Sequence, residues 1–79
     1  MARIGRMFWN PTLGNPHPSE VEAELREVRM NGCEKLLQLS TFGSVDRQSR
    51  PKVSQTIQLD KEHAIELRRA IDKLFPREE

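Results

Sequence analysis

The chain has 79 residues, of which 35% are apolar and 32% charged, and its net charge is +1. This length holds one small domain with a thin core, which leaves no room for a second domain and favours a homodimer whose partner covers apolar surface. Because so small a net charge gives no overall attraction to a polyanion, any contact with nucleic acid must come from a local basic surface.

The first 18 residues are predicted to form an N-terminal arm and a linker. The start, "RIGRMFW", is either a short strand or an arm, and it sets Arg3 and Arg6 beside Phe8 and Trp9. Basic and aromatic side chains together can stack on unpaired bases, although the two rings can instead pack on the edge of the core. Residues 10–18 are rich in Pro, Gly and Asn, which predicts an extended linker. No apolar run of the length of a signal peptide or membrane span follows, so we expect no membrane partner.

Residues 19–32 fit two structures. As a helix, the segment has Ser19 as N-cap, Glu22 three residues later and Gly32 as a stop. As a strand, its apolar residues alternate with charges, and Asn31-Gly32 is a strong hairpin turn into the next segment. The turn and the scarcity of core elsewhere favour a strand over about residues 23–30.

Two further segments have the alternating pattern of strands. In "KLLQLSTF" at 35–42, Leu37, Leu39 and Thr41 share one face, and in "KVSQTIQL" at 52–59, the odd-numbered residues 53 to 59 share one face. Between them, "GSVDRQSRPK" at 43–52 is a polar loop that is longer than a tight hairpin needs. These segments predict an antiparallel hairpin with a basic loop.

The last element is an amphipathic helix over about residues 61–75. Asp60 stands in the N-cap position and Pro76 ends the element. Its apolar stripe consists of Ala64, Leu67, Ile71, Leu74 and Phe75, and we expect this face to be buried. The predicted fold class is therefore α+β, with a small antiparallel sheet of three to four strands packed on one C-terminal helix, and residues 19–79 form a single domain.

The sequence contains no arrangement typical of an enzyme. His17 lies in the linker, His63 lies in the first turn of the helix, and Cys33 follows a turn with no histidine beside it. These isolated positions predict solvated side chains rather than a nucleophile, a base or metal ligands, and the four glycines form no phosphate loop. We therefore expect no catalytic residues, no metal and no cofactor. A single cysteine excludes an internal disulfide and is compatible with a reducing cytoplasm.

The strongest candidates for a functional site lie in the polar loop and in the strand that follows it. Arg47, Arg50 and Lys52 can reach phosphates as long, flexible cations. If the strand buries its odd-numbered residues under the helix, Ser54, Thr56 and Gln58 face outward beside the loop as neutral hydrogen-bonding groups. The loop and these strand residues, assisted by Arg3 and Arg6, form the predicted nucleic-acid site, although a charged loop of this kind can equally be a solvated connector.

The layout from Arg26 to Phe75 resembles the single-stranded-DNA-binding transcriptional coactivator family, which contains positive cofactor four and its bacterial relatives. The resemblance lies in "CEKLLQLSTF", the basic loop and "KVSQTIQLDKEHAIEL", in which a lysine leads into a strand that ends at the cap of an amphipathic helix. It implies curved antiparallel strands, a dimerising helix, and basic and aromatic groups that hold unpaired DNA. The proline-rich residues 10–18 and the few strand aromatics depart from the family pattern.

We therefore expect a small nucleic-acid-binding domain that prefers single-stranded DNA, has little sequence selectivity, and forms a homodimer in the cytoplasm. The alternative is a protein–protein interaction module, such as an accessory or inhibitor subunit of a bacterial or phage system, which uses the same loop or a sheet edge.

Overall fold

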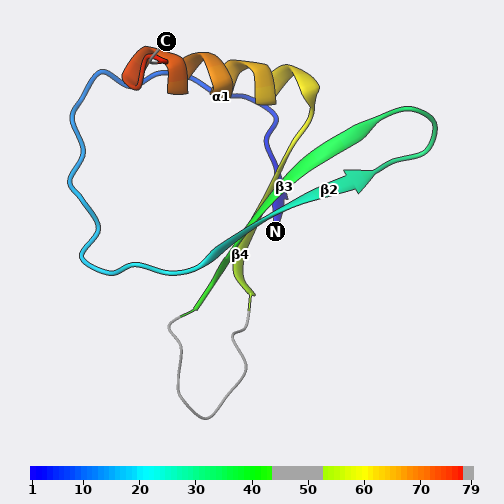
Figure 1. Ribbon diagram of the computed structural model, residues 1–79, viewed down its shortest axis with the longest axis horizontal. Helices are drawn as coiled ribbons and strands as arrows, with labels where there is room; N and C mark the ends of the chain where they lie inside the picture. Colours follow the sequence, from blue (N-terminus) through cyan, green and yellow to red (C-terminus); the bar gives the residue numbers. More distant parts are fainter. Residues whose placement is uncertain (44–52, 78–79) are drawn as a thin grey trace.

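The computed structural model describes residues 1–43 and 53–77, and it contains one sheet and one helix. The elements are β1 (Ala2–Arg3), β2 (Ala23–Arg29), β3 (Lys35–Phe42), β4 (Val53–Leu59) and α1 (Lys61–Leu74). The strands lie in the order β1-β4-β3-β2, and α1 contacts β3 and β4 (Figure 1). This layout confirms the predicted α+β fold class. It adds one feature, because β1 pairs with β4 in parallel and makes the sheet mixed rather than wholly antiparallel.

The ambiguous segment 19–32 forms a strand and a turn. β2 pairs with β3 in antiparallel register from Ala23 opposite Thr41 to Arg29 opposite Lys35. Gly32 has φ +81°, and the Met30 N–H donates to the Glu34 carbonyl across the loop. A two-residue type I′ turn needs positive φ at both central residues, and Asn31 has none, so the chain reverses over three residues instead.

β4 pairs with β3 along its whole length, with one irregularity. Leu39 lies opposite Ile57 and Thr41 opposite Gln55, whereas Phe42 lies opposite Val53. Ser54 is therefore the extra residue of a β-bulge. Because a bulge interrupts the alternation of side chains, Ser54 does not simply continue the face that carries Thr56 and Gln58.

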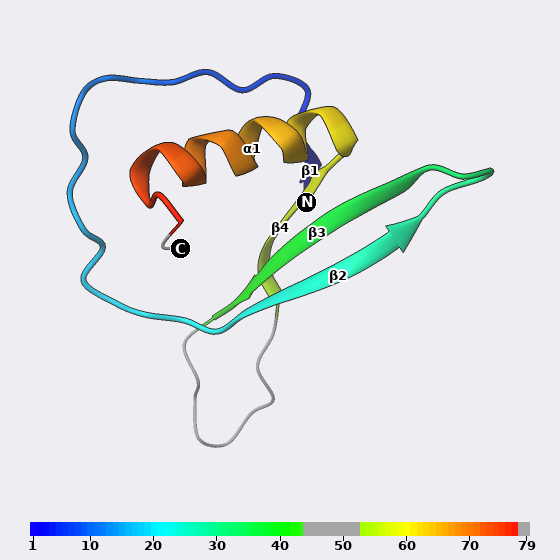
Figure 2. The ribbon, with the colours of Figure 1, turned by 45° about the horizontal axis from the view of Figure 1, so that its top comes forward.

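The helix begins as predicted and is buried less than predicted. The Asp60 carboxylate accepts from the His63 N–H at 3.0 Å as the N-cap, and the Phe75 N–H closes the last turn on the Ile71 carbonyl. α1 leaves the sheet next to the end of β4, and its C-terminal end lies away from the strands (Figure 2). Leu59 at the junction is buried, but Leu74 is 58% exposed. The expectation that the whole apolar stripe is buried is therefore wrong, because the sheet covers only the first part of α1.

The N-terminal segment runs from β1 along α1 (Figure 1). The Lys73 ammonium lies 4.4 Å from the centre of the Trp9 ring, in a cation–π contact. Phe8 remains largely exposed, with the Arg6 guanidinium 5.5 Å from its ring centre. Trp9 thus lies against the helix, whereas Phe8 is largely exposed on the arm.

Candidate nucleic-acid interface

The three cations at the centre of the predicted site, Arg47, Arg50 and Lys52, lie outside the described residues. The chain on either side is described, since β3 ends at Phe42 and β4 begins at Val53. Any site that includes these cations is therefore continuous along the chain with the ends of the two central strands.

The register of the sheet brings together four long polar side chains from four strands. Arg3 in β1 lies opposite Gln58 in β4, Gln58 opposite Gln38 in β3, and Gln38 opposite Arg26 in β2. Opposed residues of neighbouring strands share a face, so these four side chains form a row across the sheet. The row has an arginine at each end and two glutamine amides in the middle. We call this set the cross-sheet row.

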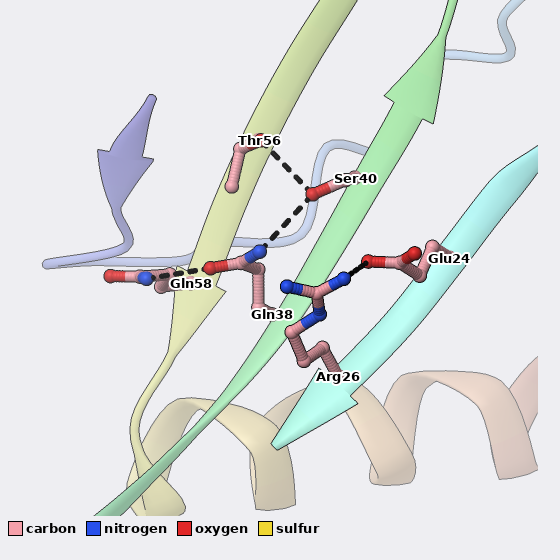
Figure 3. A network of polar contacts seen from close by, with 6 residues as sticks. All are labelled: Glu24, Arg26, Gln38, Ser40, Thr56 and Gln58. Atoms are coloured by element: carbon pink, nitrogen blue, oxygen red, sulfur yellow. Dashed lines mark hydrogen bonds and ion pairs between the residues drawn. The ribbon is translucent and has the colours of Figure 1, made fainter. Parts of the chain in front are cut away.

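Hydrogen bonds fix the centre of the row (Figure 3). Gln58 donates through Nε2 to Gln38 Oε1 at 2.9 Å, and Gln38 donates through Nε2 to Ser40 Oγ at 3.3 Å. The Ser40 and Thr56 hydroxyls bond to each other at 3.0 Å. In the same view α1 lies behind the strands, so this network lies on the face of the sheet turned away from the helix. Connected bonds of this kind hold side chains in one orientation and lower the entropy they lose on meeting a ligand.

The predicted neutral contacts differ in accessibility. Thr56 is only 6% exposed, and its hydroxyl already bonds to Ser40, which is 2% exposed. The expectation that Thr56 is a free outward contact is therefore wrong, because the residue is buried and its hydroxyl is already hydrogen-bonded to Ser40. Gln58 is half-buried and has an amide oxygen without a bond among the described residues, while Ser54 is exposed at the bulge. Gln58 and Ser54 remain accessible, and Thr56 is a structural support.

Sequence reasoning missed Gln38 and Arg26. The signal was present, since Gln38 alternates with the apolar residues of its strand and Arg26 alternates with those of β2, but it required the register between strands. Arg26 is not a free cation, because its guanidinium forms an ion pair with Glu24 at 2.8 Å. Glu24 is opposite Ser40 and so lies on the same face as Arg26.

Arg3 lies at the other end of the row, near the start of the helix. Asp60 accepts hydrogen bonds from the His63 backbone N–H and from His63 Nδ1 at 2.7 Å, and these bonds lower the pKa of the Asp60 carboxyl, with a small further contribution from Arg3. The hydrogen bond that the His63 ring makes to the Asp60 carboxylate in turn raises the pKa of His63. Arg6, in contrast, is exposed on the arm, outside the sheet.

Beside the interface, a hollow of ≈ 1000 Å³ separates the start of α1 from the β2–β3 hairpin. Leu25, Leu37 and Ala64 contribute apolar surface, and charged residues including Arg3 and Asp60 surround them. In residues 1–43 and 53–77, no three His, Cys, Asp or Glu side chains lie close enough to hold a metal ion. The single described helix is too short and too polar to cross a membrane. Cys33 is exposed at the hairpin turn.

Comparison with known proteins gives no family assignment, since no family model, curated protein or solved structure matches the chain.

Proposed function

We propose that this protein binds nucleic acid, with single-stranded DNA as its preferred ligand, as a homodimer in the cytoplasm. The observation that carries the proposal is the cross-sheet row, in which half-buried amides held by hydrogen bonds lie between two arginines on the sheet face turned away from the helix. Amide groups of this kind can donate to phosphates or bases, while cations supply most of the affinity for phosphate.

The charge for this binding comes chiefly from residues 43–52 and from the N-terminus. By sequence, the loop contributes Arg47, Arg50 and Lys52 against one acidic residue, and β1 contributes Arg3. Arg26 contributes little, because Glu24 neutralises it. Phosphate contacts carry no base identity, so the proposed binding has little sequence preference. The likeness in layout to the single-stranded-DNA-binding coactivators supports the same proposal.

The test is fluorescence anisotropy of a labelled oligothymidine and a matched duplex at 50 and 200 mM salt. Three phosphate contacts to a single strand give a salt slope of about −2, so affinity should fall roughly 20-fold between the two salt concentrations. The variant R47A/R50A/K52A should lose most of the binding and most of this slope.

A matched control removes three positive charges from the other layer of the molecule. R68A/R69A/R77A changes the net charge by the same amount at exposed positions of α1 and just beyond it. This control should bind within about threefold of the wild type, since nonspecific attraction between separated charges is largely screened. Equal losses in both triple variants, or no binding at 50 mM salt, would refute the proposal.

A protein-interaction module is the second candidate, and one observation favours it. Ile71, Leu74 and Phe75 are exposed on the part of α1 that the sheet does not cover. Large exposed apolar side chains that adjoin one another typically mark a protein contact. Failure of all DNA binding together with stoichiometric binding to one protein would favour this candidate.

A further inference from the structure

β2 is an edge strand, because no strand among the described residues pairs with its outer side. β2 is the last strand in the order β1-β4-β3-β2, and Figures 1 and 2 show no described segment beside its outer side. Such an edge presents unpaired backbone groups that can pair with another strand. Proteins commonly protect edges of this kind with charged residues, so the pattern of charges decides which strand can be added.

The backbone of β2 shows which residues are free to pair. The Met30 N–H bonds to Glu34 and the Phe42 N–H bonds to Glu22, so the even-numbered positions at both ends of β2 are bonded to β3. Hydrogen-bonded and non-hydrogen-bonded positions alternate along an antiparallel pair. The N–H and C=O groups of Ala23, Leu25, Glu27 and Arg29 therefore point to the open edge.

We propose that two copies of the chain dimerise by antiparallel pairing of their β2 strands about a twofold axis at Leu25. In this register Leu25 lies opposite the partner's Leu25. The free N–H and C=O groups of the two residues then bond to each other, as in a hydrogen-bonded pair of an antiparallel sheet. Ala23 then pairs with the partner's Glu27 through the same kind of backbone bonds. The inference deepens the dimeric part of the proposed function, on which it rests, and it does not depend on nucleic-acid binding.

Charge complementarity selects this register. Glu24 lies opposite the partner's Arg26, and Arg26 opposite the partner's Glu24, so the ion pair of 2.8 Å within each strand becomes a cluster of four alternating charges. Moving the axis to Arg26 opposes two arginines, and moving it to Glu27 opposes two glutamates, both of which repel. An axis at Val28 also opposes unlike charges, but it pairs only residues 27–29 of each strand, whereas the axis at Leu25 pairs residues 23–27.

The same register covers exposed apolar surface. Leu25 is 69% exposed in the single chain and lies opposite Leu39 on the face away from the polar network. In the dimer, Leu25 packs against the partner's Leu25, next to Leu39 of β3. The twofold axis runs perpendicular to the sheet, so the polar face of one copy and the polar face of the other lie on the same side. The two polar faces therefore join into one surface across eight strands. The dimer thus doubles the length of the proposed nucleic-acid surface.

The test uses two single charge reversals and their mixture in analytical ultracentrifugation without nucleic acid. The wild type should sediment at twice the 9.2 kDa mass of one chain. E24R and R26E should each weaken dimerisation roughly tenfold or more, because each opposes like charges at two symmetric positions. An equimolar mixture of E24R and R26E should restore the dimer, since every opposed pair in the mixed dimer is again attractive.

The control applies the same design to Glu27 and Arg29, which also form an ion pair within β2 at 2.6 Å. E27R and R29E should leave the dimer within about threefold of the wild type, because neither residue meets a charge of the partner in the proposed register. Circular dichroism confirms that each variant is folded. A wild type that remains a monomer, an E24R variant that dimerises normally, or restoration only by mixed E27R and R29E would overturn the inference. DNA anisotropy measured separately distinguishes this failure from failure of the nucleic-acid proposal.

Discussion

The free energy of unfolding of variants at Ser40 and Thr56 tests whether the polar network stabilises the sheet. The two oxygens are 3.0 Å apart and both residues are buried. S40A leaves the Thr56 hydroxyl without this partner in a buried place, which should cost about 1–3 kcal/mol in the free energy of unfolding. T56V keeps the shape and loses one neutral hydrogen bond, while Ser40 keeps Gln38 as a donor, so the cost should be about 1 kcal/mol.

The double variant S40A/T56V removes both partners together, so it should cost about 1 kcal/mol less than the sum of the single variants. The assay is urea denaturation at one fixed protein concentration, with the midpoint compared at constant m-value, because the proposed dimerisation would make stability depend on concentration. S54A removes an exposed hydroxyl of the same strand and should stay within about 0.5 kcal/mol of the wild type. Strictly additive costs for S40A and T56V would refute the coupled network.

Three further predictions concern the helix. D60A should lower the free energy of unfolding by about 1 kcal/mol in urea denaturation, because it removes the side chain that caps α1, and an unchanged midpoint would contradict the cap. The pKa of His63 is raised and that of Asp60 is lowered, so their interaction stabilises the folded state fully between about pH 3.8 and 6.5. The urea midpoint should therefore fall as the pH rises through the raised pKa of His63, and the H63A variant should show a smaller fall. L59A should cost about 2–5 kcal/mol and L74A less than about 1 kcal/mol by the same assay, because Leu59 is buried and Leu74 is exposed; equal costs would mean that the end of α1 is covered.

Local patterns predicted β2, β3, β4 and α1 well, because these elements have periodic patterns and boundary signals of their own. Asp60 and Pro76 mark the helix, and Asn31-Gly32 decided residues 23–30 in favour of a strand, which β2 confirms. β1 was harder to predict, because two residues are too few for a periodic pattern and their pairing with β4 is a contact distant in sequence.

The site was predicted less completely, since its composition depends on register. Alternation alone placed Thr56 and Gln58 on one face, but only the register shows that Ser40 covers the Thr56 hydroxyl and that Gln38 meets Gln58. The burial of the helix stripe failed for a similar reason. The apolar stripe shows which side of α1 is apolar. How much of that side packs against the sheet depends on the direction in which the helix leaves the end of β4, which the sequence pattern does not show.

The most direct test of the central claim is a two-dimensional ¹⁵N NMR titration with a short oligothymidine at low salt. The account predicts that binding shifts the side-chain amide signals of Gln38 and Gln58 and the backbone signals of Arg3 and Ser54. Signals from the middle of α1 should remain unchanged, because the helix lies behind the sheet face that carries the cross-sheet row. Shifts confined to α1, or none at saturating oligonucleotide, would contradict the assignment of this face as a nucleic-acid surface.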